Sequence, residues 1–293
     1  MRTDKKVAII GGDARQEEVA VILGTHDFEI AVYGFEPRAD VPHTKCRTFE
    51  DAVQSACAVL LPVPSFSKGA SGGATVNGTA VKASALMQAL PRGQRVVGGF
   101  FNDFIEQYQD TFRLYNVLAS ESFQIPNAVL TAESAIEIAI RKLPISLWNS
   151  NALVIGYGRI GKILAAALRE LGAHVTVAAR SADARALASA NHITAADCAG
   201  HDLDLCLRRA DVVFNTVPAQ ILTGERLLYA SRCRLILDLA SGDGGVDFSA
   251  AERMEIPALH ALGLPGKSAP VSAGRILAAC VEDYFRKEGL MKS

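Results

Sequence analysis

The chain lacks an excess of charge of either sign, and it lacks long apolar runs. Its 293 residues include 30 lysines and arginines against 31 aspartates and glutamates, for a formal net charge of −1. A nearly neutral chain offers no basic face, which argues against nucleic acid as the main partner. No apolar stretch approaches the ~20 residues that a membrane helix needs. The first residues lead into an apolar strand without a cleavable signal pattern, which predicts a cytoplasmic protein.

Cysteine and histidine are few and scattered. The six cysteines include no pair separated by two residues, so reduced and mostly buried thiols are expected rather than disulfides. The six histidines show no metal-ligand spacing, and no metal is predicted. Apolar residues are plentiful instead. At 49% of the chain, they can fill the cores of two domains of ordinary size.

The most informative segment is 152–180, which reads as a strand, a glycine turn, a helix and a second strand. Gly156, Gly158 and Gly161 have the spacing of the dinucleotide fingerprint. In that motif the glycines permit a tight turn, a close backbone approach to a pyrophosphate, and close packing of the helix on the strand. The sequence therefore predicts a Rossmann-type nucleotide-binding unit.

The N-terminus of the helix after this turn is the expected pyrophosphate site. Backbone N–H groups of Gly158, Arg159 and Ile160 lie there, where unpaired donors meet the positive end of the helix dipole. The Arg159 side chain either adds a phosphate contact or is simply solvated.

The end of the second strand indicates which dinucleotide binds. An acidic residue there usually accepts the adenosine ribose hydroxyls. This chain has Ala178 and Ala179 instead, followed by Arg180 and Ser181. A cation after a small neutral residue suits a 2′-phosphate, so NADP is predicted, with NAD possible.

Further cofactor contacts are expected where later strands end, because the carboxyl edge of a parallel sheet faces the nucleotide. Asp238 has two interpretations: it orients the nicotinamide amide, or it is a buried strand-end carboxylate that holds a turn. The residues predicted to contact the cofactor at this edge are Thr216, Pro218, Asp238, Leu239, Ala240, Leu264 and Pro265.

Strands alternate with helices along the whole chain, which predicts an α/β fold with two doubly wound parallel-sheet domains. Thr131 is a plausible N-cap for a connector helix over 131–142, and the Gly-, Ser- and Thr-rich segment 69–78 predicts a loop.

The C-terminal helix is expected to return to the first domain. The predicted limits are an N-terminal substrate-side domain at 1–128, a connector at 129–148, the NADP-binding domain at 149–271, and the C-terminal helix at 272–293.

Several segments go beyond a generic nucleotide-binding protein. The most specific is 261–270, in which Gly263, Leu264, Pro265 and Gly266 precede Ala269 and Pro270. With these segments the chain resembles the A-subunit family of dipicolinate synthase, found in spore-forming bacteria. Segment 241–248 departs from the family pattern, because Gly242 and Asp243 stand where a basic residue and a proline are usual. The other matching segments are 10–15, 61–64, 131–133, 154–161, 177–180, 215–219, 238–241, 244–248 and 273–277.

The resemblance implies an enzyme that oxidises dihydrodipicolinate to dipicolinate, pyridine-2,6-dicarboxylate, with a nicotinamide cofactor during sporulation in the mother cell. It also implies that the flavoprotein-like B-subunit of dipicolinate synthase is the partner, and a homo-oligomer is expected. Loss of a hydride and a proton makes the ring aromatic, so the protein needs mainly to hold the ring against the cofactor and accept one proton.

A dicarboxylate substrate requires cations or converging N–H donors. The predicted substrate residues in the first domain are Asp13 and Arg15, which follow the first strand, and Ser65 and Ser67, which follow a proline-rich turn. This edge is expected to face the second domain across a cleft.

Two residues of the second domain are predicted to act in catalysis. His260, near a strand end, is a candidate proton acceptor, because an imidazole titrates near neutral pH. The alternative is a half-buried strand histidine without a catalytic role. Lys267 is a candidate partner for a substrate carboxylate.

Two other functions stay open. One is a non-catalytic scaffold subunit that binds NADP without turnover. The other is a reductase resembling 2-hydroxyacid dehydrogenases, which require an arginine, a glutamate and a histidine after successive strands. Position 240, in the neighbourhood expected for that arginine, is alanine, and no matching glutamate–histidine spacing follows.

Overall fold

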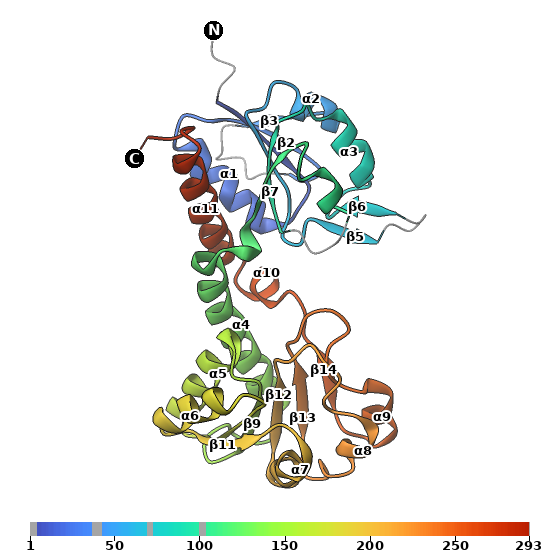
Figure 1. Ribbon diagram of the computed structural model, residues 1–293, viewed down its shortest axis with the longest axis vertical. Helices are drawn as coiled ribbons and strands as arrows, with labels where there is room; N and C mark the ends of the chain where they lie inside the picture. Colours follow the sequence, from blue (N-terminus) through green and yellow to red (C-terminus); the bar gives the residue numbers. More distant parts are fainter. Residues whose placement is uncertain (1–4, 37–42, 69–72, 100–103, 293) are drawn as a thin grey trace. The chain divides into compact units, whose positions relative to one another are not determined.

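The computed structural model describes residues 5–36, 43–68, 73–99 and 104–292. The chain divides into two compact units: the first contains residues 1–126 and 269–293, and the second contains residues 127–268. Each is built on a six-stranded sheet whose strands all run parallel, flanked by helices (Figure 1). The predicted fold class, α/β with two doubly wound parallel sheets, is confirmed.

The first unit has the strand order β3-β2-β1-β4-β7-β8 and a separate antiparallel hairpin, β5-β6. Its strands are β1 (Lys6–Ile10), β2 (Glu29–Tyr33), β3 (Thr44–Lys45), β4 (Ala58–Leu60), β5 (Phe66–Lys68), β6 (Ala74–Val76), β7 (Arg95–Gly98) and β8 (Arg113–Asn116). Its helices are α1 (Ala14–Gly24), α2 (Phe49–Val53), α3 (Ala83–Ala89), the short 3-10 turns η1 (Glu106–Tyr108) and η2 (Val117–Ala119), and α11 (Pro270–Lys287). Helix α4 (Glu121–Lys142) begins in this unit and continues into the second.

The C-terminal helix α11 completes the core of the first unit by packing against α1. The helices approach closely at Gly274, where an added Cβ would lie 2.6 Å from Glu18 Cβ and 2.8 Å from the Arg15 carbonyl oxygen. Phe285 is fully buried, and its ring centroid lies 5.3 Å from that of Phe28. A chain segment that follows the second unit in sequence is therefore an integral part of the first.

The second unit has the strand order β11-β10-β9-β12-β13-β14. Counted within the unit, this is 3-2-1-4-5-6, the order of dinucleotide-binding sheets, with its reversal between β9 and β12. Its strands are β9 (Asn151–Ile155), β10 (His174–Ala179), β11 (Thr194–Asp197), β12 (Val212–Asn215), β13 (Leu235–Asp238) and β14 (Ala258–His260). Its helices are α5 (Arg159–Glu170), α6 (Ala182–Ala190), α7 (Gly200–Arg209), α8 (Gly224–Leu227), α9 (Phe248–Arg253) and α10 (Leu264–Ser268).

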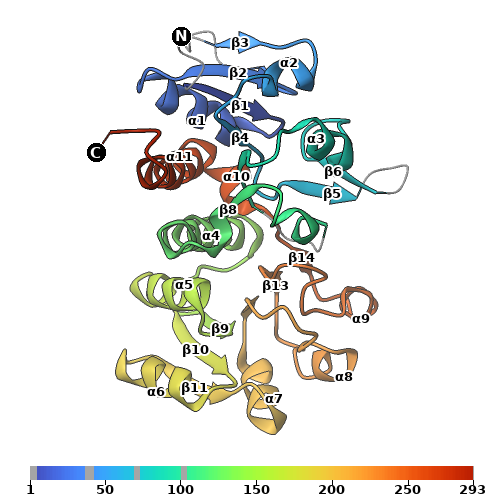
Figure 2. The same cartoon turned by 45° about the horizontal axis from the view of Figure 1, so that its top comes forward.

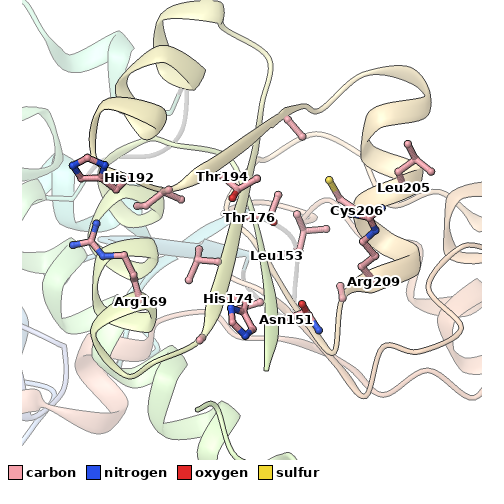
Figure 3. Close-up of a pocket in the computed structure, with 16 residues that line it drawn as sticks. Asn151, Leu153, Arg169, His174, Thr176, His192, Thr194, Leu205, Cys206 and Arg209 are labelled. Carbon is pink, nitrogen blue, oxygen red and sulfur yellow. The ribbon is translucent and has the colours of Figure 1, made fainter. Parts of the chain in front are cut away.

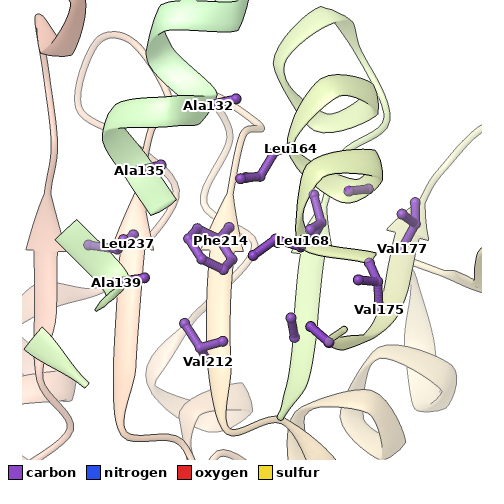
Figure 4. Packing of buried hydrophobic residues seen from close by; sticks show 14 of the residues in the cluster. Ala132, Ala135, Ala139, Leu164, Leu168, Val175, Val177, Val212, Phe214 and Leu237 are labelled. Atoms are coloured by element: carbon purple, nitrogen blue, oxygen red, sulfur yellow. The ribbon is translucent and has the colours of Figure 1, made fainter. Parts of the chain in front are cut away.

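Both faces of this sheet are apolar, as expected for parallel strands covered on two sides. Helices α5 and α6 lie on one face and α8 and α9 on the other (Figure 2). On the α5 face, Phe214 packs with Leu237 and with alanines of α4, whose small side chains let that helix approach the sheet (Figure 4). The opposite face buries Leu153 and Ile155 against α7. Successive side chains of a strand such as β9 therefore point in turn into two separate cores.

The structure corrects the predicted start of the connector helix. Helix α4 begins at Glu121, ten residues before the predicted N-cap, and it contains Pro126. Thr131 is therefore inside the helix, where its Oγ1 donates to the Asn127 carbonyl oxygen at 2.9 Å. Phe123 and Ala128 are both buried. Packing on both sides of the proline offsets the single backbone hydrogen bond that proline removes.

The predicted loop over 69–78 is also partly wrong. Residues 74–76 form β6, which pairs with β5, while 69–72 lie outside the described residues. Thr75 and Val76 favour a strand, but the surrounding glycines and serine hide that preference in the sequence.

Glu288 links α11 to the edge of the first sheet, and this link makes a testable contribution to stability. Its Oε2 accepts hydrogen bonds from Arg95 Nε at 2.9 Å and Arg113 Nη1 at 3.0 Å. Burial raises the pKa of Glu288, but the hydrogen bonds and charges of the two arginines outweigh burial, so the pKa lies below its ordinary value.

We expect Glu288→Gln to lower the free energy of unfolding at pH 7 by ~1 kcal/mol. Because the folded-state pKa is depressed, this stabilisation is present above the unfolded pKa of ~4.3. It is lost as the pH falls through the folded-state pKa, so the variant and the parent should converge in acid. Urea unfolding at several pH values measures the difference. Asp283→Asn, at a more exposed carboxylate of α11, is the control; an equal loss there would contradict a specific role for Glu288.

Candidate functional site

The glycine turn between β9 and α5 has the geometry that a dinucleotide requires. Gly156 has a φ of +96°, and an added Cβ would lie 2.3 Å from Thr216 Oγ1. A Cβ on Gly161 would lie 2.2 Å from the Gly156 carbonyl oxygen. A Cβ on Gly158 would meet nothing within 4 Å. The first and third glycines are thus required by packing, while the second leaves open space for a ligand to approach the backbone.

Helix α5 begins directly behind this open space. Its N-cap is Gly158, and no side chain caps it by a hydrogen bond. The N–H groups of a first helical turn have no partner within the helix, and the positive end of the dipole lies there. Thr216, at the end of β12, donates to the Ile155 carbonyl oxygen at 2.9 Å and so holds the two strand ends at the reversal point together. The residues present fit a pyrophosphate here.

The end of β10 carries two arginines. Arg180 is exposed, and no ion pair engages it within the described part of the chain. Arg185 Nη1 donates to the carbonyl oxygens of Ala179 at 2.8 Å and Arg180 at 2.7 Å, and it pairs with Asp197 Oδ2 at 3.0 Å. Ser181 caps α6 by accepting from the Ala184 N–H at 3.4 Å. Arg185 was not identified from the sequence, because a helix-surface arginine has no distinguishing local signal.

Asp238 is fully buried at the end of β13, and its carboxylate accepts three hydrogen bonds. The donors are Asn215 Nδ2 at 2.8 Å, the Gly245 N–H at 2.6 Å and the Ala240 N–H at 3.1 Å. These contacts match the second interpretation of Asp238, a strand-end carboxylate that holds a turn. A direct contact with the nicotinamide stays a prediction.

Asn215 is the main residue that sequence reasoning missed at this edge. It is fully buried at the end of β12, and its amide contacts both Asp238 and the Val217 backbone. Gly244 and Gly245 pass directly over this pair: an added Cβ would lie 2.3 Å from Asp238 Oδ2 at the first and 2.5 Å from Asn215 Nδ2 at the second. The two glycines were visible in the sequence, but their partner was not.

His260, at the end of β14, lies beside the same loop. Its Nε2 is 3.1 Å from the Ala240 carbonyl oxygen, and its ring lies 5.6 Å from that of Phe248. A carbonyl oxygen can only accept, so Nε2 carries the hydrogen in this contact. Nδ1 is consequently the one ring nitrogen of His260 that can accept a proton in this arrangement.

Helix α10 separates the predicted residues of its segment into two groups. Leu264 and Pro265 are buried, and Leu264 belongs to the core on the α5 face. Lys267 is exposed on the same helix. Ser268 Oγ bonds to Ser134 of α4 and so anchors α10.

The three remaining predicted residues of this edge also divide by exposure. Leu239 and Ala240 are buried beside Asp238, whereas Pro218 is exposed. Contacts of the buried residues with a nicotinamide stay predictions.

In the first unit, Asp13 and Arg15 bind each other. Asp13 Oδ1 accepts from Arg15 Nε at 2.9 Å and Oδ2 from Nη2 at 2.8 Å. Burial raises the pKa of Asp13, but the hydrogen bonds and charge of Arg15 outweigh burial and place it below its ordinary value. Asp13 also caps α1. The charge of Arg15, the cation predicted to bind substrate, is thus compensated by Asp13.

The two predicted serines differ in their surroundings. Ser65 is fully buried, and its Oγ donates to the Pro62 carbonyl oxygen at 2.9 Å. Ser67 is exposed on β5, with its Oγ 3.5 Å from Thr75 Oγ1. Ser65 therefore holds the turn after β4, and Ser67 is the serine with an accessible hydroxyl.

The first unit has the same strand order as the second, but its own chain covers the corresponding turn. The Gly12 N–H donates to the Asn77 carbonyl oxygen at 3.0 Å. An added Cβ on Gly11 would lie 2.3 Å from that oxygen, and one on Gly78 would lie 2.6 Å from the Gly12 nitrogen. The place of a pyrophosphate is taken by the turn that follows β6, so the nucleotide-binding geometry belongs to the second unit.

Two features of other protein classes are absent from the described residues. No group of three or more histidine, cysteine, aspartate or glutamate side chains there is arranged to hold a metal ion. Among the described helices, none has both the length and the apolar character to cross a membrane.

Family models match both units. Residues 6–117 match the N-terminal domain of the dipicolinate synthase A-subunit. Residues 131–227 match the NAD binding domain of D-isomer specific 2-hydroxyacid dehydrogenases. The second match covers the glycine turn and the ends of β10 and β12, so the open turn described above belongs to a nicotinamide dinucleotide-binding type of domain.

Whole-chain relatives agree with these matches. A crystal structure of the dipicolinate synthase A-subunit from Bacillus halodurans has a TM-score of 0.87 at 33% identity, covering 97% of this chain and 98% of that one. The corresponding crystal structure from Bacillus subtilis gives 0.84 at 31% identity, with 98% and 97% covered. The dipicolinate synthase A-subunit of Bacillus subtilis (strain 168) is 34% identical over 285 residues, 95% of each chain. The chain therefore belongs to the A-subunit family of dipicolinate synthase.

Proposed function

We propose that this protein oxidises dihydrodipicolinate to dipicolinate with NADP as the hydride acceptor. The observation that carries the proposal is the open glycine turn of the second unit in a chain whose relatives are named dipicolinate synthase. The bound dinucleotide would supply the hydride acceptor. Oxidation yields an aromatic pyridine and is strongly downhill, so the protein's tasks are to position the ring and remove one proton.

The preference for NADP over NAD rests on charge at the end of β10. Asp197, the register partner of Ala179 on the neighbouring strand β11, forms an ion pair with Arg185. Arg180 is exposed and precedes the N-terminus of α6, so a 2′-phosphate there would meet a guanidinium and a positive helix end.

In the first unit, Arg15 and Ser67 are proposed to bind a substrate carboxylate. In the second unit, Lys267 is proposed as a partner for a carboxylate. Asp13 occupies Nε and Nη2 of Arg15, so the remaining N–H groups of that guanidinium would donate to a carboxylate. Nδ1 of His260 is proposed to accept the proton, because Nε2 is held by the Ala240 carbonyl.

The flavoprotein B-subunit of dipicolinate synthase is the proposed partner, on the basis that the named relatives are one subunit type of a synthase. The proposal also includes a homo-oligomer and a location in the cytoplasm of the mother cell during sporulation.

The activity itself has a direct test. Purified protein mixed with NADP and freshly prepared dihydrodipicolinate should produce dipicolinate, followed by its ultraviolet absorbance, with and without the flavoprotein partner. Replacing NADP by NAD should slow the reaction. Tight NADP binding with no product in either mixture would instead support a non-catalytic scaffold and refute the enzyme proposal.

Arg180→Ala tests the choice of cofactor. Loss of a charged hydrogen bond to a 2′-phosphate should weaken NADP binding about tenfold while NAD binding changes little. Fluorescence titration of each dinucleotide measures this. Arg141→Ala, which removes another exposed arginine of the same unit, is the control. An equal loss for both dinucleotides would show that Arg180 is not at the phosphate.

Arg15→Ala tests the substrate site. The KM for dihydrodipicolinate should rise about tenfold, because one charged donor to a carboxylate is lost. The dissociation constant of NADP should stay the same, since Arg15 belongs to the first unit. Steady-state kinetics and dinucleotide titration measure the two quantities. A loss of cofactor affinity with an unchanged KM would contradict the assignment.

A further inference from the structure

A pocket lies in the second unit, away from the glycine turn. It has a volume of about 490 Å³ and is lined by the first residues of β9, β10 and β11, including Asn151, His174 and Thr194 (Figure 3). The glycine turn follows the last residue of β9. Because the strands are parallel, this pocket is at the amino edge of the sheet, whereas the dinucleotide site is at the carboxyl edge.

The floor of this pocket is polar where a covered sheet face is normally apolar. Thr176 pairs in register with Leu153 on one side and with Thr194 on the other. Register partners in neighbouring strands point to the same face, so the two threonine side chains lie side by side. Within the described residues, no hydrogen bond to protein engages either hydroxyl.

Two arginines are among the lining residues. Arg209 lies on the α7 side of the strands, the face to which Leu153 and its register partner Thr176 belong, whereas Arg169 and His192 lie on the other side (Figure 3). Arg169 is partly compensated, because its Nη2 pairs with Glu170 at 2.8 Å. Arg209 forms no ion pair within the described part of the chain. No aspartate or glutamate is among the lining residues.

The lining also includes apolar side chains, notably Leu153, Val175, Ile193 and Leu205. The volume is in the range of small-molecule sites. Both arginines lie in the last turns of their helices, α5 and α7, whose carbonyl ends repel anions. Side chains alone therefore supply the attraction for an anion. Doubly charged phosphates are typically bound at a helix N-terminus, so a pocket beside helix C-termini favours a singly charged carboxylate.

We infer that this amino-edge pocket binds a small carboxylate with an apolar body, independently of the dinucleotide site. The carboxylate oxygens would accept from the hydroxyls of Thr176 and Thr194 and from the guanidinium of Arg209, while the apolar body packs on Leu153 and Leu205.

The test uses the full chain with benzoate and inorganic phosphate as probes, titrated by calorimetry at constant ionic strength. Benzoate should bind and phosphate should not. Arg209→Gln should weaken benzoate about tenfold, by loss of a charge-assisted hydrogen bond. Arg208→Gln is the matched control, because that guanidinium lies over the Tyr229 ring, 4.9 Å from its centroid. In methyl-labelled protein, the Leu153 and Leu205 resonances should shift.

A second variant keeps the test independent of Arg209. Thr176→Val with Thr194→Val preserves side-chain shape and removes both hydroxyls, so benzoate affinity should again fall about tenfold while NADP affinity is retained. The inference is overturned if benzoate gives no heat, if phosphate binds equally well, or if neither variant changes the affinity. It is also overturned if Arg15→Gln abolishes benzoate binding, because the probe would then occupy the proposed substrate residues.

Discussion

The close approach of Gly161 to the Gly156 carbonyl oxygen is the contact on which the dinucleotide-binding turn, at the carboxyl edge of the second sheet, depends. A Cβ at Gly161 would lie 2.2 Å from that oxygen, so no other residue lets α5 pack this closely on the end of β9. That packing brings the uncapped N-terminus of α5 to the point where strand order reverses. The backbone donors there require no side chain, which leaves the neighbouring strand ends to determine which dinucleotide binds.

The two units show how one topology can leave the turn after its first strand either covered or open. Both have the order 3-2-1-4-5-6, and both place glycines after the first strand. In the first unit the Asn77 carbonyl accepts the Gly12 N–H, and Asp13 caps α1. The donors that would bind a phosphate are thus used internally. The second unit lacks such a covering turn, and Gly158 has open space around it.

The sequence predicted those parts of the structure that depend on local pattern. The glycine spacing, the apolar strands of both sheets and the C-terminal helix are all visible as short-range signals. The edge strands β3, β8 and β11 have no such signal, since a short edge strand such as Thr194–Asp197 contains no apolar run. The predicted start of α4 was wrong, because tertiary packing lets the helix continue through Pro126. The Asn215–Asp238 contact joins residues 23 positions apart on neighbouring strands, and only the sheet brings them together.

The two carboxylates at the carboxyl edge of the second sheet, Asp238 and Asp197, both have partners within the protein. Asp238 is surrounded by three donors, and Asp197 pairs with Arg185. The guanidinium of Arg185 therefore compensates the charge of Asp197, and the carboxylate of Asp238 is directed at buried donors of the protein, while Arg180 stays exposed at the end of β10. The same network also orients His260, because Asp238 accepts from the Ala240 N–H and the Ala240 carbonyl oxygen lies 3.1 Å from His260 Nε2. A residue buried for structural reasons thus determines which nitrogen of His260 can receive a proton.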